Sequence, residues 1–121
     1  MKETYAAAGG LHILAKLYSR DLACLRDMPR AKKEISAAVA GAGLQELGSY
    51  YHAFPEGGFT GVVCLAESHI ALHTWPEHGY LTMDIYVCNY TKDNSDACRE
   101  VFAAICRLFG ADRVEKHELS R

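Results

Sequence analysis

The chain has 121 residues, half of them apolar, and a net charge of −2. This length suits one domain with one hydrophobic core, and the charge provides no basic surface for nucleic acid or for an anionic membrane. No apolar stretch is long enough to cross a bilayer or to form a signal peptide. We therefore expect a single cytoplasmic domain over residues 1–121, with no nucleic-acid or membrane partner.

The first half of the chain predicts two strands and a helix. Residues 11–17 alternate between apolar and polar, which is typical of a strand with one buried face. A helical pattern with proline at its start covers residues 29–42 and ends at Gly43. Residues 45–54 predict a second strand, and the Pro-Glu-Gly-Gly sequence at 55–58 predicts a turn.

The second half predicts four further strands: residues 59–66, 69–75, 80–87 and 113–119. An amphipathic helix precedes the last of them, capped by Asp93 or Ser95 and ended by Gly110. The order is β-α-β-β-β-β-α-β. It predicts an α+β two-layer sandwich, a mostly antiparallel sheet with two helices on one face. The other face would be solvated or would pair with another copy, and the apolar middle strands favour a partner.

Five cysteines without CxxC spacing argue against a disulfide framework or a zinc ribbon. Cys98 and Cys106 lie in the amphipathic helical pattern, and Cys64 lies in an apolar run. We expect these three to be small buried residues. Cys88 differs because it ends a predicted strand beside polar residues.

Reactive side chains are concentrated between Glu67 and Cys88, where a serine, three histidines, three carboxylates, a tryptophan and a cysteine occur. Alternation along a strand would place Ser68 on one face and His69 and His73 on the other, unless the chain bends at Glu67-Ser68. Taken alone, the two histidines could be polar residues of a half-solvated face. A zinc site would add His78 and Cys88 but has no second closely spaced ligand pair, and a Ser–His hydrolase would need a Gly-x-Ser-x-Gly turn around the serine.

The whole segment is more specific than any pair within it. Residues 66–80, AESHIALHTWPEHGY, followed by Asp84 and Cys88, resemble the prokaryotic S-adenosylmethionine decarboxylase proenzymes. The resemblance covers most of the chain and includes these further segments: Gly10-x-His12, residues 21–27, Phe54-Pro55 and Gly57-Gly58-x-Thr60-Gly61.

This resemblance implies a proenzyme that cleaves itself. Ser68 would attack the carbonyl of Glu67, and elimination followed by hydrolysis would convert Ser68 into a pyruvoyl group. His73 stands at the position of the processing base. Thr60 stands where the family usually carries a serine whose hydroxyl assists processing. The products would be a β chain of residues 1–67 and an α chain of residues 68–121.

The resemblance also implies the chemistry of turnover. The pyruvoyl group made from Ser68 would form a Schiff base with the substrate amine and accept electrons as CO₂ leaves, so neither a metal nor pyridoxal phosphate is expected. Cys88 matches the family's proton donor, a role that suits a thiol of tunable pKa. The expected product is decarboxylated S-adenosylmethionine, the aminopropyl donor of spermidine synthesis.

Three residues are implied in substrate binding. Phe54 matches an aromatic side chain that stacks on adenine, and Glu77 matches a carboxylate that binds the ribose hydroxyls. Trp75 either lines the same pocket or packs the turn. The remaining polar residues of the segment are expected to be supporting or structural: His69, His78, Tyr80 and Asp84.

The match departs from the family at two places. Thr60 replaces a serine, and Asn89-Tyr90 follow Cys88 where relatives often have glycine. A pyruvoyl-dependent ornithine or arginine decarboxylase, or an unprocessed adenosyl-binding homologue, are therefore the alternatives to the S-adenosylmethionine enzyme. In each enzyme case the family implies a homodimer of processed protomers, with active sites between the copies.

Overall fold

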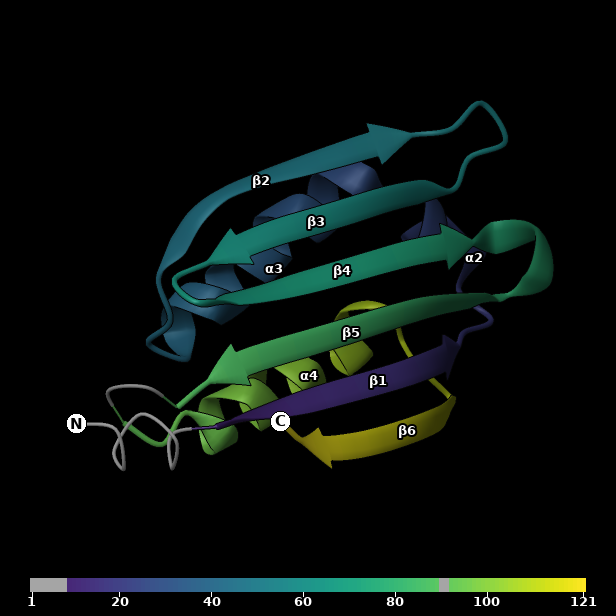
Figure 1. Ribbon diagram of the computed structural model, residues 1–121. Helices are drawn as coiled ribbons and strands as arrows, with labels where there is room; N and C mark the ends of the chain where they lie inside the picture. The colour runs from purple at the N-terminus through teal and green to yellow at the C-terminus, as the bar shows by residue number, and fades with distance from the viewer. Residues whose placement is uncertain (1–8, 90–91) are drawn as a thin grey trace.

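Six strands form one antiparallel sheet in the order β2-β3-β4-β5-β1-β6 (Figure 1). The computed structural model describes residues 9–89 and 92–121. The strands are β1 (Gly10–Tyr18), β2 (Glu46–Ala53), β3 (Phe59–Leu65), β4 (Ser68–Trp75), β5 (Tyr80–Cys88) and β6 (Arg113–Ser120). Each pair of neighbours is antiparallel. The predicted strands are confirmed, with bounds that differ by a few residues.

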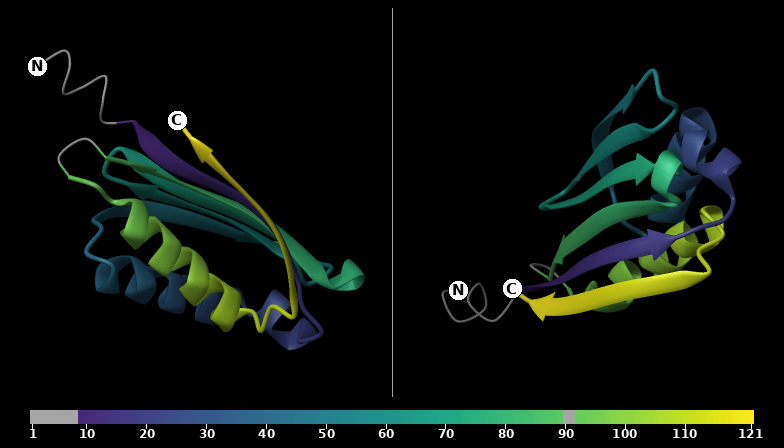
Figure 2. Two further views of the ribbon diagram at one scale, coloured as in Figure 1. Left: turned by 90° about the horizontal axis from the view of Figure 1, so that it is seen from below. Right: turned by 90° about the vertical axis from the view of Figure 1, so that its right-hand side faces the viewer.

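Two main helices, α3 (Met28–Gly41) and α4 (Ser95–Leu108), cover one face of this sheet (Figure 2). The predicted α+β two-layer sandwich is confirmed. A short helix that was not predicted, α2 (Leu22–Arg26), precedes α3. Asp21 accepts a hydrogen bond from the Cys24 amide at its start, and Asp27 caps α3 in the same way. Five residues are too few for a helical period to be visible in the sequence. No helix among the described residues has both the length and the apolar character needed to span a membrane.

The core lies between the helices and the covered face of the sheet. Apolar side chains alternate into it along β1, β4 and β5, as the period-2 patterns predict. Phe59 and Phe109 pack there with ring centroids 6.5 Å apart. Residues of this core that are essentially inaccessible to solvent include Ile13, Leu17, Ile35, Val39, Ile70, Leu72, Leu81, Ile85 and Ile105. Each contributes about 1.5–3 kcal/mol by its burial.

The prediction for the cysteines is only partly correct. Cys98 is buried, and burial raises the pKa of its thiol to about 11. Cys106 is partly buried, whereas Cys64 is exposed. The prediction for Cys64 is wrong because β3 alternates: Val63 and Leu65 face the helices, so Cys64 faces the opposite side.

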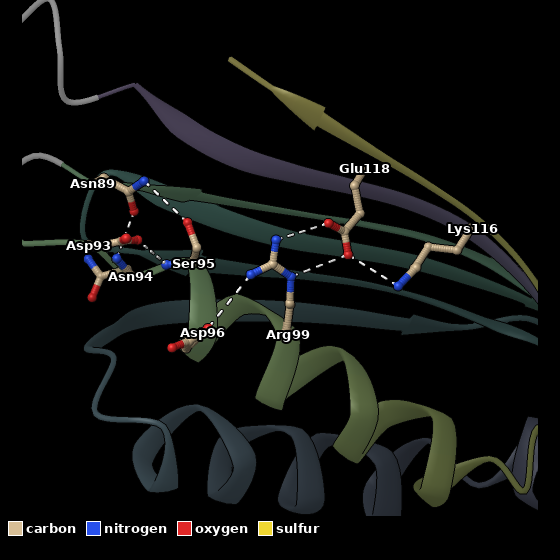
Figure 3. Close-up of polar contacts among 8 residues, drawn as sticks. All are labelled: Asn89, Asp93, Asn94, Ser95, Asp96, Arg99, Lys116 and Glu118. Carbon is tan, nitrogen blue, oxygen red and sulfur yellow. Dashed lines mark hydrogen bonds and ion pairs between the residues drawn. The ribbon is translucent and has the colours of Figure 1, made fainter.

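The start of α4 also differs from its prediction (Figure 3). The N-cap residue is Asn94, not Asp93 or Ser95. Asp93 still contributes, because its carboxylate accepts a hydrogen bond of 2.9 Å from the Ser95 amide. Further along α4, Arg99 pairs with Glu118 of β6 at 3.1 Å, which ties the helix to the edge strand.

The face of the sheet opposite the helices, here called the open face, carries apolar side chains. Strand register places five residues in one row across it: Tyr50, Val62, Ala71, Asp84 and Leu14. Of these, Tyr50 is 69% exposed and Val62 45% exposed. Four of these five side chains are apolar or aromatic and the fifth, Asp84, is a carboxylate, so the open face exposes a mostly apolar row to solvent.

Candidate active site

The Glu67-Ser68 bond lies in the tight turn between β3 and β4. Leu65 pairs with Ser68, so only two residues form the connection. Glu67 has φ 60°, and it is the one non-glycine residue with positive φ in the described part of the chain. A residue with a Cβ atom in this conformation costs about 1–2 kcal/mol. The backbone is therefore strained at the predicted cleavage site, a property that the sequence did not reveal.

Ser68 and Cys88 are neighbours across β4 and β5. The Cys88 amide donates a hydrogen bond of 3.0 Å to the Ser68 hydroxyl oxygen. A cavity of about 430 Å³ adjoins both residues of the turn and Cys88, and its lining consists of Gly43, Leu44, Gln45, Ala66, Glu67, Cys88, Lys92 and Asn94. The predicted cleavage site and proton donor thus lie together at one end of the sheet, and we call Glu67, Ser68 and Cys88 the serine group.

Thr60 and His73 form a second pair, on β3 and β4. They are register partners, and a hydrogen bond of 2.9 Å joins the Thr60 hydroxyl to His73 Nδ1. Both line a pocket of about 240 Å³ together with Phe54, Glu56, Gly58, Thr74, Trp75 and Glu77. The predicted processing residues and the predicted substrate-binding residues therefore share one site, which we call the histidine group: Phe54, Thr60, His73, Trp75 and Glu77.

A glycine turn holds Phe54 at the edge of this pocket. The Phe54 amide donates to the Gly58 carbonyl at 2.8 Å, and the Gly57 amide donates back to the Phe54 carbonyl at 2.9 Å. Gly57 has φ 105°, and a Cβ atom on Gly58 would lie 2.6 Å from the Thr74 carbonyl oxygen. The His52 ring packs edge-on against Phe54, with centroids 4.9 Å apart. Phe54 remains 45% exposed and Trp75 41% exposed, so both rings are accessible to a ligand.

The structure does not bring the serine group and the histidine group together within one chain. Ser68 begins β4, and His73 lies five residues further along the same strand. A strand rise of about 3.3 Å per residue separates their Cα atoms by roughly 16 Å. A base must lie within hydrogen-bond reach of the proton that it removes. His73 therefore cannot act on Ser68 of its own chain in this conformation.

A third polar cluster, His12, His69 and Asp84, lies on the open face between these groups. Asp84 Oδ2 is 2.8 Å from His12 Nε2 and 3.1 Å from His69 Nε2. Burial alone would raise the pKa of Asp84, but the hydrogen bonds to both histidines outweigh it and hold that pKa below its ordinary value. These hydrogen bonds are a way in which His69 and Asp84 could support the site. The sequence alone did not link His12 to them.

The same three side chains could in principle ligate a metal, because one ligand atom of each lies within 4.8 Å of the others. The Arg121 guanidinium argues for hydrogen bonding instead. It lies 3.3 Å from His12 Nδ1, and because a guanidinium can only donate, Nδ1 must accept. His12 then carries its proton on Nε2 and donates it to Asp84.

Comparison with known proteins identifies the family of this chain. A family model described as S-adenosylmethionine decarboxylase matches residues 11–121. The chain belongs to the S-adenosylmethionine decarboxylase family. The crystal structure of the adenosylmethionine decarboxylase from Aquifex aeolicus superposes with a TM-score of 0.83 at 35% identity, over 94% of this chain and 91% of that one.

Several curated relatives of this family are named S-adenosylmethionine decarboxylase proenzyme. The Aquifex aeolicus relative is 43% identical over 88% of this chain and 76% of its own length. The Carboxydothermus hydrogenoformans relative is 37% identical over 93% and 85%. The Sulfurihydrogenibium relative is 48% identical, but this chain spans only 59% of its length. The resemblance and the fold predicted from the sequence are confirmed, and the roles of individual site residues stay predictions.

Proposed function

We propose that this chain is a self-processing, pyruvoyl-dependent decarboxylase of S-adenosylmethionine. The observation that carries the proposal is the left-handed backbone of Glu67, φ 60°, directly before the bond to Ser68, together with the Ser68 hydroxyl held by the Cys88 amide. Conversion of the peptide into an ester would lengthen the connection between β3 and β4 by one bond, so Glu67 could leave its left-handed conformation. The name proenzyme that the relatives carry agrees with such a cleavage.

Processing uses the chain's own atoms. Ser68 Oγ adds to the Glu67 carbonyl carbon, the C–N bond breaks, and the Ser68 nitrogen takes a proton. A base then removes the Ser68 α-proton, the Cβ–Oγ bond breaks, and the oxygen leaves with Glu67 as a carboxylate. The remaining enamine takes up water and releases ammonia, which leaves a pyruvoyl group at position 68. We assign the base to His73 of a second copy and propose that Thr60 of that copy, 2.9 Å from its His73, orients the ring.

The serine group suits the pyruvoyl cofactor. When formed, the pyruvoyl carbonyl would supply the electron sink for loss of CO₂. Cys88 is half-buried beside Ser68 and lines the cavity at that end of the sheet, so its thiol is available to return a proton. A position next to both the cofactor residue and a cavity is what a proton donor requires.

The histidine group suits an adenosyl ligand. Phe54 and Trp75 offer accessible aromatic faces for a base and for a sulfonium cation, and Glu77 offers a carboxylate for a pair of hydroxyls. The pocket of about 240 Å³ is smaller than the roughly 300–1,000 Å³ typical of complete ligand sites. This size agrees with a pocket that is only part of the active site.

We infer that the active form is a homodimer through the open face. A two-fold axis parallel to the sheet and perpendicular to its strands would stack the two open faces, with the serine-group end of one copy over the histidine-group end of the other, and it would create two equal composite sites. It would also cover the apolar row that contains Tyr50, Val62 and Leu14. One arrangement thus accounts for both the 16 Å separation and the exposed apolar surface. A cytoplasmic location agrees with five free cysteines, which stay reduced there.

Denaturing mass spectrometry tests the processing step. The mature protein should give fragments 1–67 and 68–121, the second blocked by a pyruvoyl group. Ser68→Ala should give only the full-length chain. Persistence of intact wild-type chain after prolonged incubation would refute the proposed function and would favour an unprocessed adenosyl-binding homologue.

Release of CO₂ from S-adenosylmethionine, ornithine and arginine, measured side by side, tests the substrate. We expect turnover of S-adenosylmethionine alone. Glu77→Gln should raise KM for it, whereas Glu100→Gln, an exposed change on α4, should not. Turnover of ornithine or arginine in place of S-adenosylmethionine would assign the chain to a different decarboxylase on the same fold.

A further inference from the structure

The side chain of Asn94 does not cap α4, although Asn94 is the residue directly before this helix. Asn94 is the N-cap residue, where an asparagine side chain ordinarily accepts a hydrogen bond from the first turn of the helix. Here the side chain makes no capping bond. It instead donates from Nδ2 to the Cys88 carbonyl oxygen at 3.0 Å. The Asn94 side chain thus contacts the predicted proton donor Cys88 and does not cap the helix.

Asn89 anchors the backbone of Asn94 (Figure 3). Asn89 Oδ1 accepts a hydrogen bond of 2.7 Å from the main-chain N–H of Asn94, and Asn89 Nδ2 lies 3.4 Å from the Ser95 hydroxyl. The Asn89 amide donates to the Gly9 carbonyl at 3.0 Å. Asn89 therefore connects the end of β5 to the start of α4, a connection that glycine at this position could not make.

The Cys88 backbone is consequently fixed at both of its polar groups. Asn94 binds its carbonyl oxygen, and its amide donates to Ser68 Oγ. The first contact restricts the rotation of the residue and so holds the direction of the amide N–H. A donor aimed at Ser68 Oγ stabilises the negative charge that develops there as the hydroxyl loses its proton and attacks Glu67.

We propose that Asn94, braced by Asn89, is a positioning residue that sets the orientation of Cys88 for both stages of the reaction. Before cleavage it directs the Cys88 amide at the attacking oxygen. Cleavage transfers that oxygen to the Glu67 carboxylate, so the same N–H loses this acceptor and becomes available to the processed residue or to the substrate. After cleavage the contact fixes the Cys88 thiol. The inference rests on the proposed function.

The experiment uses Asn94→Asp, which keeps the size of the side chain but removes its amide donor. Aspartate is also a good N-cap, so Tm should stay at or above that of the wild type. The precursor should nevertheless cleave about tenfold more slowly, the effect of one ordinary hydrogen bond. The processed variant should also complete fewer turnovers before its active site is lost, because the thiol is less well aimed. Asn89→Gly should show the same changes more weakly.

Asp96→Asn is the matched control, since it changes the charge of the first turn of α4 at a side chain that pairs with Arg99. It should cleave and turn over as the wild type does. The inference is refuted if Asn94→Asp cleaves at the wild-type rate, or if slow cleavage occurs only with a lowered Tm and equally in Asp96→Asn. Failure of the wild type itself to cleave would refute the proposed function, which is a distinguishable result.

Discussion

Mixing two inactive variants should restore processing if the active site is built from two copies. Ser68→Ala removes the cleavable residue of the serine group, and His73→Ala removes the base of the histidine group. Neither homodimer contains a complete site. In a heterodimer, Ser68 of the His73→Ala chain faces His73 of the Ser68→Ala chain, so one of the two composite sites is intact.

The expected yield follows from the geometry and from random pairing. Equal amounts of the two chains form heterodimers in about half of all dimers, so about half of the His73→Ala chains should be cleaved. No Ser68→Ala chain should be cleaved. Co-expression followed by denaturing mass spectrometry distinguishes these outcomes, because fragment 68–121 released from a mixed dimer must carry the His73→Ala mass.

A matched control excludes a general effect of mixing. The double variant Ser68→Ala/His73→Ala, paired with His73→Ala, supplies no His73 in either copy, so cleavage should stay at the level of His73→Ala alone. If the single-variant mixture also stays at that level, the composite site is wrong. Ser68 would then have to be processed within its own chain, despite the separation of roughly 16 Å that five strand residues impose.

Three further changes test particular contacts. In the Ser68→Ala background, Glu67→Gly should raise the free energy of unfolding in urea by about 0.5–1 kcal/mol, because glycine tolerates φ 60°; with Ser68 present, it should slow cleavage. If Glu67→Gly cleaves at the wild-type rate, the strained backbone of Glu67 does not contribute to cleavage. Asp84→Asn should destabilise the fold by about 1–2 kcal/mol at neutral pH. Folding lowers the pKa of Asp84 from 3.8, so the difference in unfolding free energy between wild type and Asp84→Asn should persist above about pH 4. It should disappear as the pH falls through the pKa of Asp84 in the folded state. A difference that stays constant with pH would contradict this reasoning. Gly61→Ala should lower the free energy of unfolding by about 1–3 kcal/mol, because the new Cβ atom would lie 2.4 Å from the Tyr51 ring. A Tm equal to that of the wild type would show that the ring can move away.

The sheet was predictable because its strands alternate clearly and end at recognisable turns. Ile70 and Leu72 point to the helices, as period-2 alternation requires, while His73 points to the open face. The short helix α2 was not predictable, since five residues show no helical period. The exposed Cys64 was misjudged because an apolar run does not show which of its alternate residues faces the core.

The candidate site was predictable as a set of residues but not as an arrangement. The resemblance identified Ser68, His73 and Cys88, yet nothing in their spacing showed that the first and last lie together and the second apart. That separation follows from strand rise and register, which depend on pairing between distant segments. The cap of α4 could not be predicted for a similar reason. Asp93, Asn94 and Ser95 are all good N-cap types, and their side chains do not decide where α4 begins, since that of the N-cap residue Asn94 binds Cys88 and not the helix.

The proposed composite site would make maturation depend on dimerisation. A strand is stiff and its side chains occupy fixed positions. With the proposed cleavage site at one end of β4 and its proposed base at the other, an isolated chain would not react. The open face adds a reason to associate, since its apolar row is exposed until a second copy covers it. A monomer would then keep both the strained backbone of Glu67 and its exposed surface, whereas pairing would cover the surface and allow the cleavage that frees Glu67. Cleavage should accordingly depend on protein concentration below the dissociation constant of the dimer, and cleavage at a rate independent of dilution would show that one chain suffices.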